Sequence, residues 1–429
     1  MRWPDPPWPC TLRNIFDQYK QPENQLTHAL ASSLAEDSQL ARRFLTGFLD
    51  LKDTPKTSLK VNEQSLPGDS ADLPEEEAER RGLPDAVIHD GENWCLLLET
   101  KVQAKATADQ LHRHYRSVRR RGFENVRVVL LTARDERIKL PKFAEARRWR
   151  DLYIWLVNER RRSVWAGRVT DFLEIMEAKL VDEGYLTEGA LTSFSGFQFG
   201  PDRPYSYGEA KRLLRLAIQQ LRTSKRLEKA LGMDPKGFGR PAITGKDASS
   251  VWDFIPLKAA RSAKVFTEFP HLTLSVQQER VLAIVTIPNR LKPRFRRSLT
   301  SLGRKGFFDL FQQVTLNLSH VLNAAPGSSP RLEALQRHYL SRRSEPVRDA
   351  VLEFDLRTAT ADGQAVKNQP QWLDAVYGVL SNMNSNYQLA VGIAFPYQQC
   401  TKIREVKALD LIEETWLRLA PLIDAILER

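Results

Sequence analysis

Apolar side chains recur along the first 190 residues with two different periods, which predict a mixture of helices and strands. Leu26, Leu30 and Leu34 follow Pro22 at four-residue spacing, which is typical of an amphipathic helix. Short apolar runs such as Val126–Thr132 predict buried strands instead. One expected helix begins near residue 22, and two more cover 107–121 and 170–181. The expected strands cover 57–66, 85–89, 93–102, 126–132 and 152–157. A strand, a helix and a strand in this order indicate a right-handed crossover and a mixed sheet.

The composition changes over residues 182–207, which are rich in Gly, Ser, Thr and Pro. Such a segment is typical of a connection between domains, so we expect one domain over residues 1–190 and a second over residues 200–429. The pattern of the second part predicts an α+β domain. Its expected elements are a basic helix near 208–230, a hairpin of 272–276 with 281–287, strands near 351–357 and 389–396, and helices near 369–382 and 408–427.

The composition argues against several classes of protein. The 429 residues are 42% hydrophobic and 27% charged, which is typical of a globular chain. No apolar run approaches the roughly 20 residues that span a bilayer, and the start lacks the apolar core of a signal peptide. We therefore expect a cytoplasmic protein that does not enter a membrane. Three scattered cysteines suggest no disulfide framework, and the sequence has no glycine-rich phosphate loop, His-Glu-x-x-His helix or Gly-x-Ser-x-Gly elbow.

The net charge of +11 is unevenly distributed along the chain. Residues 1–100 hold 10 Lys and Arg against 18 Asp and Glu, whereas residues 101–170 hold 19 against 7. A basic segment directly after an acidic one suits a polyanion that lies beside an acidic metal pocket. Solvated helix faces are the simpler explanation of most charge runs, so this interpretation depends on the chemistry next to the basic segment.

An acidic residue and a Glu-x-Lys tripeptide lie on two neighbouring expected strands. Asp85 opens the first strand, and Glu99-Thr100-Lys101 closes the second. Residues i and i+2 of a strand share a face, so the side chains of Glu99 and Lys101 point the same way. Oxygen ligands of this kind are those that Mg²⁺ prefers. We expect Mg²⁺, with Mn²⁺ as the alternative ion, to bind Asp85, Glu99 and the backbone carbonyl of Thr100, while Lys101 orients or helps to deprotonate the attacking water.

The turn between these two strands decides whether Asp85 reaches the site. A three-residue loop over residues 90–92 would pair Asp85 with Leu97 and put Asp85 beside Glu99. A two-residue Asp-Gly turn would direct Asp85 to the opposite face unless a bulge corrected it. The alternative without any metal is an exposed hairpin whose charged side chains are ordinary cross-strand neighbours.

These residues resemble the PD-(D/E)xK nuclease superfamily, with Pro84-Asp85 and Glu99-Thr100-Lys101 as the signature within about residues 20–165. The resemblance implies a restriction-endonuclease-like α/β fold, a mixed sheet flanked by helices. It also implies an acidic residue on the helix before the sheet, here Glu23, and a Gln on the helix after the lysine strand, here Gln110. Both have local alternatives, because the helix dipole favours an acidic first turn and Thr107-Ala-Asp-Gln110 is a capping box.

The resemblance implies metal-dependent hydrolysis of phosphodiester bonds. We therefore predict a Mg²⁺-dependent endonuclease acting on double-stranded DNA in bacterial restriction or anti-phage defence, with a C-terminal recognition or effector domain. A second copy of the chain or a defence-system protein is the further expected partner. The alternatives are a catalytically silent nucleic-acid-binding or regulatory module with the same fold, and a nuclease acting in DNA repair or on RNA. The expected phosphate contacts are arginines after the site and in a basic loop after the second domain's hairpin: Arg116, Arg119, Arg120, Arg121, Arg294, Arg296 and Arg297.

Overall fold

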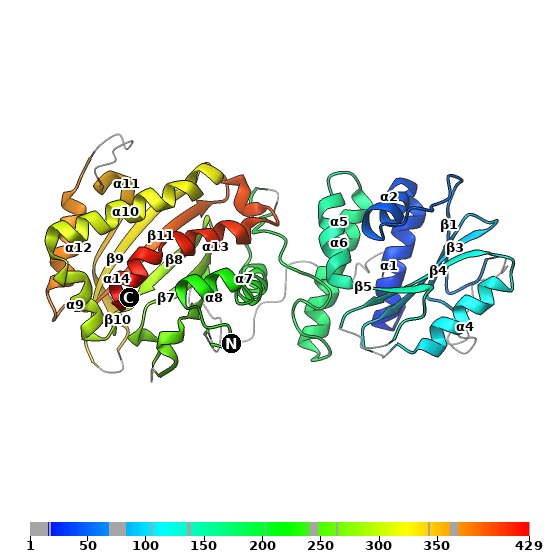
Figure 1. Ribbon diagram of the computed structural model, residues 1–429, viewed down its shortest axis with the longest axis horizontal. Helices are drawn as coiled ribbons and strands as arrows, with labels where there is room; N and C mark the ends of the chain where they lie inside the picture. The colour runs from blue at the N-terminus through cyan, green and yellow to red at the C-terminus, as the bar shows by residue number, and fades with distance from the viewer. Residues whose placement is uncertain are drawn as a thin grey trace. The chain divides into compact units, whose positions relative to one another are not determined.

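The computed structural model describes residues 16, 19–67, 83–103, 106–134, 139–201, 203–237, 239–240, 248–262, 265–341, 344–360 and 368–428. It divides into two compact units, Met1–Ser193 and Phe194–Arg429, which Figure 1 shows. Each unit has a sheet and an apolar core of its own. Within the described ranges, no helix is long and apolar enough to cross a membrane.

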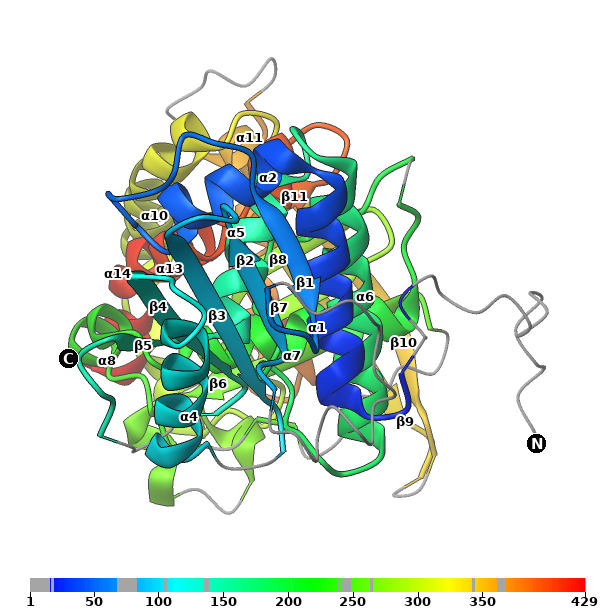
Figure 2. The same cartoon turned by 90° about the vertical axis from the view of Figure 1, so that its right-hand side faces the viewer.

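The first unit is built on a five-stranded mixed sheet. In spatial order its strands are β1 (Lys60–Glu63), β2 (Ala86–His89), β3 (Trp94–Lys101), β4 (Asn125–Thr132) and β5 (Ala144–Arg148). The pairs β1–β2 and β2–β3 are antiparallel, whereas β3–β4 and β4–β5 are parallel. Helix α4 (Ala108–Arg119) joins β3 to β4 and supplies the crossover that a parallel pair requires (Figure 2).

Helices cover both faces of this sheet. Leu96 and Leu98 of β3 belong to a core with helices α1 (Pro22–Glu36), α2 (Ser38–Arg43), α5 (Trp149–Glu159) and α6 (Val164–Asp182). Cys95 and Leu97 face the other way and pack with residues of α4. Side chains alternate along a strand, so Glu99 and Lys101 lie on the α4 face. The predicted mixed sheet flanked by helices is therefore confirmed.

One predicted strand of this unit is wrong. Residues 152–157, expected as a strand, lie inside helix α5, and the fifth strand is formed by Ala144–Arg148. The buried side chains Trp149, Leu152, Tyr153 and Leu156 recur at helical spacing. A six-residue apolar window is too short to distinguish this spacing from that of a buried strand.

The second unit is built on a six-stranded sheet in which all neighbours are antiparallel. Its order is β10 (Pro346–Asp355), β9 (Ser329–Tyr339), β11 (Tyr387–Pro396), β8 (Arg280–Ile287), β7 (His271–Gln277) and β6 (Ser250–Pro256). Its helices are α7 (Tyr207–Leu221), α8 (Lys225–Leu231), α9 (Pro293–Ser301), α10 (Gly303–Ala324), α11 (Leu356–Ala359), α12 (Gln371–Ser381), α13 (Ala408–Arg418) and α14 (Ala420–Leu427).

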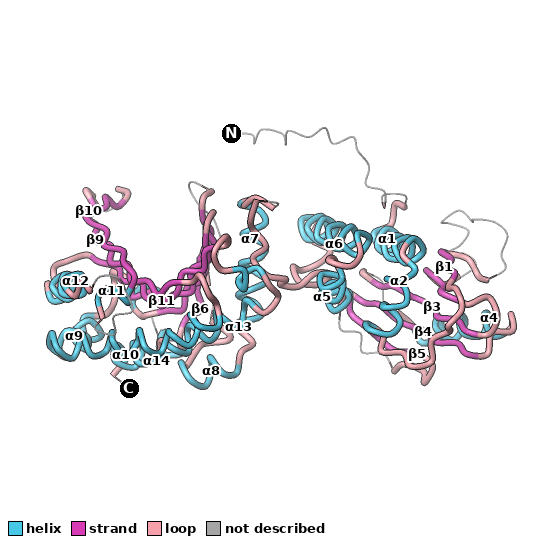
Figure 3. The backbone as a smooth tube through the Cα atoms, turned by 90° about the horizontal axis from the view of Figure 1, so that it is seen from above, coloured by secondary structure: helices cyan, strands magenta, loops and turns pink. Residues whose placement is uncertain are grey.

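The helices of this unit pack against one face of its sheet and leave the other face concave, as Figure 3 shows. Leu272, Leu274 and Val276 of β7 are buried in the core beneath the sheet. The expected α+β domain and its β7–β8 hairpin are confirmed. The prediction that the basic run after that hairpin forms a loop is wrong in part, because residues 293–301 form helix α9.

Candidate active site

The β2–β3 hairpin sets the position of the proposed acidic pair. Ala86 lies opposite Leu98 and His89 lies opposite Cys95, so the register differs by two residues from the expected pairing of Asp85 with Leu97. The loop consists of residues 91–93 rather than 90–92, because Asp90 Oδ1 accepts the backbone N–H groups of Glu92, Asn93 and Trp94. A shift of two residues keeps every side chain on its face. Continued by one residue, the observed register sets Asp85 opposite Glu99.

Asp85 is tied to the middle of the Glu-x-Lys tripeptide. Its Oδ2 accepts the backbone N–H of Thr100 at 2.6 Å and the Thr100 hydroxyl at 3.0 Å. Continuing the β2–β3 register sets Pro84 opposite Thr100. Proline has no N–H, so Pro84 cannot bond to the carbonyl of Thr100 as a strand residue would. The Thr100 carbonyl, which is predicted as a metal ligand, therefore accepts no backbone hydrogen bond from Pro84.

Three side chains contact the carboxylate of Glu99, which is 1% exposed. Its Oε1 lies 2.7 Å from Nζ of Lys101 and accepts the Nε2–H of Gln110 at 2.5 Å. Its Oε2 lies 3.1 Å from Nε2 of the buried His114. Gln110 and His114 are four residues apart on α4, so both reach the same point of the sheet. The Gln110 side chain therefore contacts Glu99, while the N-cap of α4 is the Thr107 hydroxyl, which accepts the Gln110 backbone N–H.

Helix α1 approaches the same end of β3 from the other face of the sheet. Glu23 Oε1 accepts the backbone N–H groups of Val102 and Gln103 at 2.7 and 2.9 Å, and its Oε2 lies 3.8 Å from Nζ of Lys101. Thr27, one turn later, places its hydroxyl 2.7 Å from that of Thr100. Glu23 thus anchors the chain that leaves β3 and adds negative charge near Lys101.

The charges of the site alter one another's pKa values. Burial and then the charge of Glu99 raise the pKa of Asp85 to about 7. Burial would also raise the pKa of Glu99, but His114 and Lys101 outweigh it and hold that pKa below its usual value. Burial would lower the pKa of Lys101, but Glu99 and Asp85 outweigh it and raise that pKa. The site therefore contains a charged lysine and two carboxylates whose mutual repulsion a cation would relieve.

The donor set fits a magnesium ion that is held only in part by protein. Among the described side chains, no group of three or more His, Cys, Asp and Glu could hold a metal ion. Mg²⁺ commonly takes one or two carboxylates and fills its other positions with water and substrate phosphate. Asp85, Glu99 and the Thr100 carbonyl are hard oxygen donors of that kind, and burial together with the charge of Glu99 raises the pKa of Asp85.

Six of the seven predicted phosphate-binding arginines are exposed, and these six divide into two groups. Arg116, Arg120, Arg294 and Arg297 have exposed side chains on or beside helices α4 and α9. Arg119 donates to the carbonyls of Phe123 and Glu124, and Arg121 donates to the carbonyl of Pro67, so these two exposed side chains also hold local structure.

Arg296 contradicts the expectation of a phosphate contact. It is 7% exposed and donates to the carbonyls of Leu380, Val379 and Ser385 at the end of α12. The orphaned carbonyls at a helix C-terminus need donors, and Arg296 supplies several from one guanidinium. It is therefore a structural residue of the second unit.

Sequence reasoning missed two contributors to the site. Neither His114 nor Thr27 was among the residues predicted for the site. A signal for His114 was present, because it follows the predicted site residue Gln110 by four residues, one turn along the same helix face. Thr27 could not be found by spacing alone, because its contact with Thr100 joins residues 73 positions apart.

The fold and site of the first unit define an α/β domain with an acidic centre at the end of its central strand. A family model described as the PD-(D/E)XK nuclease superfamily matches residues 13–173. The resemblance carried by Pro84-Asp85 and Glu99-Thr100-Lys101 is thereby confirmed for this segment. Nucleases of this superfamily generally use divalent metal ions, and the superfamily also includes inactive members. A search of curated proteins found no match to the chain.

Proposed function

We propose that this protein is a Mg²⁺-dependent DNA endonuclease. The observation that carries the proposal is the convergence of Asp85, Glu99 and Lys101 at one end of the sheet, with Asp85 fixed to Thr100 and Lys101 placed 2.7 Å from Glu99. The match of residues 13–173 to a nuclease superfamily supports it. An ion pair of Lys101 with Glu99 that only stabilised the fold would need no further side chains. It would not require Asp85, the buried His114 and Gln110 at the same point.

The residues that would hold Mg²⁺ are Asp85, Glu99 and the backbone carbonyl of Thr100. When bound, the ion polarises the scissile phosphate and lowers the pKa of a bound water. Thr100 fixes Oδ2 of Asp85 through two hydrogen bonds, and Gln110 and His114 fix the two oxygens of Glu99. Supporting contacts of this kind orient the ligands of a metal and commonly change its affinity.

Lys101 acts through its positive charge. Burial would lower the pKa of Lys101, but the charges of Glu99 and Asp85 outweigh it and raise that pKa, which favours the protonated form. The ammonium group can orient the attacking water and stabilise the negative charge that develops on the phosphate. Glu23 and Glu99 hold the ammonium at the end of β3.

DNA is the proposed substrate because of the charge around this site. Helix α4 carries Gln110 and His114 toward Glu99. Arg116 is exposed on this helix, and the exposed Arg120 follows its last residue. Arginine binds phosphate groups at fixed geometry, and such contacts position a duplex without reading its sequence. We therefore propose cleavage of double-stranded DNA with phosphate contacts along α4. Arg294 and Arg297 of α9 are separate proposed phosphate contacts of the second unit.

A cleavage assay tests this function. The full chain is incubated with supercoiled plasmid, linear duplex and single-stranded RNA of matched length, each with Mg²⁺, Mn²⁺ or EDTA. We expect nicking or linearisation of plasmid with Mg²⁺ and none with EDTA. Cleavage of RNA alone would identify RNA, and not DNA, as the substrate. Binding of DNA without cleavage under every condition would favour the catalytically silent module.

We further propose a role in restriction or anti-phage defence, which rests on the family resemblance and on the joining of a nuclease-like unit to a second unit with its own sheet and core. Plaque formation by a panel of phages on bacteria that express the chain, compared with the Asp85→Asn variant, tests this role. Protection that requires Asp85 would support it. Equal plaque numbers for both would remove the defence role and leave the cleavage assay unaffected.

A further inference from the structure

The concave face of the second unit's sheet contains a cavity, lined by both polar and apolar side chains, that the nuclease site does not use. It has a volume of about 510 Å³, and a second cavity of about 470 Å³ shares part of its lining. Along β7, His271, Thr273 and Ser275 face this cavity, whereas the residues between them are in the core. Cavities of a few hundred Å³ with a small number of fixed polar groups are typical of small-molecule sites.

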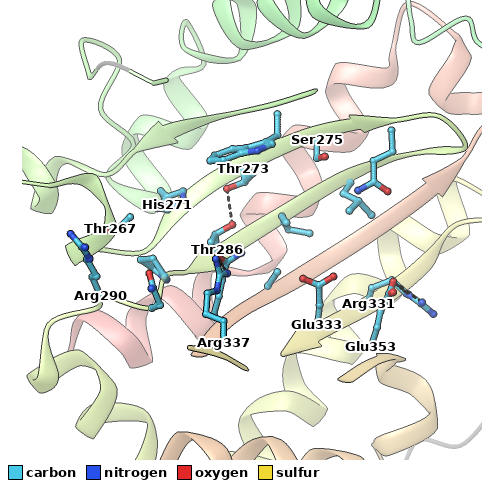
Figure 4. A pocket seen from close by; sticks show the side chains of 18 of the residues that line it. Thr267, His271, Thr273, Ser275, Thr286, Arg290, Arg331, Glu333, Arg337 and Glu353 are labelled. Carbon is cyan, nitrogen blue, oxygen red and sulfur yellow. Dashed lines mark hydrogen bonds and ion pairs between the residues drawn. The ribbon is translucent and has the colours of Figure 1, made fainter. Parts of the chain in front are cut away.

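Glu333 of β9 is the unusual group of this cavity. Figure 4 shows its carboxylate directed into the cavity from the strand. Within the described part of the chain it makes no hydrogen bond or ion pair, and burial together with the charge of Glu353 raises its pKa. The neighbouring Glu353 is compensated, because Arg331 and Arg280 lie 2.7 and 3.1 Å from its Oε1. Glu333 therefore has two acceptor oxygens available for donors of a ligand.

Positive charge surrounds this carboxylate without neutralising it. Arg337 lines both cavities, and its Nη2 donates to Oε1 of Gln388 at 2.8 Å, which fixes the guanidinium. Arg290 and Arg348 are exposed lining residues that form no ion pair within the described ranges. Anionic ligands are favoured where arginines outnumber carboxylates. Four arginines and two glutamates line the two cavities together.

Trp252 of β6 adds a flat apolar surface. It lines both cavities, and the guanidinium of Arg240 stacks over its ring at 4.2 Å from the centroid. Arg240 also donates to the Trp252 carbonyl at 3.0 Å, so the tryptophan is held from one side. A tryptophan supported in this way is suited to stacking against a planar ring.

We propose that this cavity binds a nucleotide, with the base against Trp252, the base edge on Glu333 and the phosphate on Arg337 and the exposed arginines. A planar ring, adjacent N–H donors and a phosphate are the three features that these residues match. Guanine presents two neighbouring N–H groups on its pairing edge, which a carboxylate can accept together, whereas adenine does not. The site therefore selects guanine. Free nucleotides and nucleotides within a single strand share this chemistry.

Calorimetric titration of the full chain in EDTA tests the proposal. The ligands are GMP, AMP, inorganic phosphate, and two pentadeoxynucleotides that carry either dG or dA between thymidines. We expect saturable GMP binding at least about tenfold tighter than AMP binding, and none for phosphate. Oligonucleotide binding that is tighter than GMP binding, with the same base preference, identifies a strand as the source of the nucleotide, and the reverse identifies a free nucleotide.

Two variants test the assigned residues, and matched substitutions outside the cavity control for folding. Glu333→Gln should remove the preference for guanine, because the amide replaces one acceptor with a donor, and Arg337→Gln should weaken every nucleotide about tenfold or more. Glu279→Gln and Lys305→Gln, which change exposed side chains, should leave binding unchanged. Thermal unfolding midpoints within about 2 °C of the wild type show that the variants fold.

The proposal is overturned by three results. These are the absence of saturable nucleotide binding at millimolar concentration, equal binding of GMP by the wild type and both cavity variants, and binding of phosphate alone as tight as that of GMP. EDTA prevents cleavage during this titration, and only binding that the two cavity variants change is assigned to the cavity, so the outcome does not depend on the proposed endonuclease activity.

Discussion

Asp85 accepts two hydrogen bonds from Thr100, one from the backbone N–H at 2.6 Å and one from the hydroxyl at 3.0 Å. This relationship joins the start of β2 to the tripeptide that closes β3. It also fixes the oxygen of an aspartate whose pKa is raised to about 7 by burial and by Glu99. The position of Asp85 in the proposed metal site thus depends on a residue that contributes a carbonyl to the same site.

Thr100→Val separates the two hydrogen bonds. The variant keeps the backbone bond to Asp85 and loses the hydroxyl contacts with Asp85 and Thr27. We expect a loss of stability of about 1–2 kcal/mol and a fall of about tenfold in the cleavage rate, measured by urea unfolding and by plasmid nicking. Thr170→Val is the matched control, because it removes a buried hydroxyl bond on α6 outside the site. An equal loss of activity in both variants would contradict the positioning role of Thr100.

His114→Ala tests the support of Glu99 from helix α4. Removing the imidazole deletes the neighbour of Oε2 and frees the carboxylate to rotate. We expect the Mg²⁺ concentration for half-maximal cleavage to rise about 10- to 100-fold, with smaller changes in DNA affinity. His112→Ala on the same helix, whose ring packs against Phe143, should leave this concentration unchanged. A magnesium requirement that is the same in His114→Ala and the wild type would exclude this role.

Local patterns predicted the centre of the first unit well. The apolar runs of β3 and β4 and the helical spacing of α4 are strong signals, and they agree with the family signature around Asp85 and Glu99. The side-chain face of Asp85 was also predictable, because a register error of two residues preserves the face. The register itself was not, because it depends on the three hydrogen bonds that Asp90 accepts inside the loop.

The second unit was harder to predict because its elements are defined by distant contacts. Helix α10 and strand β9 were missed, although α10 is 22 residues long and buries Phe307, Phe311 and Val314 against the sheet. The burial of Arg296 in carbonyl contacts could not be inferred from a basic run, since those carbonyls lie more than 80 residues away. The alternation of polar residues along β7 was the available signal for the cavity.

Arg296→Lys distinguishes a structural arginine from a DNA contact. Lysine keeps the charge but cannot reproduce the fork that contacts Leu380, Val379 and Ser385. We expect the second unit to lose about 2–4 kcal/mol of stability, measured by chemical unfolding, because buried carbonyls lose their donors. DNA affinity measured below the unfolding transition should be unchanged. Arg297→Gln, which changes an exposed side chain, should weaken DNA binding and leave the stability unchanged. If Arg296→Lys weakened DNA binding and Arg297→Gln did not, the structural role of Arg296 would be contradicted.

His271 makes the stability of the second unit dependent on pH. Burial lowers the pKa of this histidine to about 4, and its Nδ1–H donates to the Phe269 carbonyl. Its pKa in the unfolded chain is near 6.5, so the unfolded state binds a proton first as the pH falls. The contribution of neutral His271 is therefore fully present above pH 6.5 and is lost progressively down to about pH 4. The loss amounts to about 3 kcal/mol.

The His271→Gln variant provides the comparison. We expect the wild type to lose more stability than the variant between pH 7 and pH 5 in urea unfolding experiments. A proton NMR titration of the folded wild type should show no protonation of His271 above pH 5. Protonation near pH 6.5 in the folded protein would remove the basis of this prediction.

The central claim is that Asp85 and Lys101 form a metal-dependent phosphodiesterase site. The most direct measurement is the single-turnover rate of plasmid cleavage by the wild type, Asp85→Asn and Lys101→Met with saturating Mg²⁺, with DNA affinity measured in parallel in EDTA. We expect both variants to bind DNA and to cleave at least about a thousandfold more slowly, with Asp109→Asn as an active control on the exposed face of α4. Cleavage by either variant at the rate of the wild type, or cleavage by the wild type in EDTA, would contradict the claim.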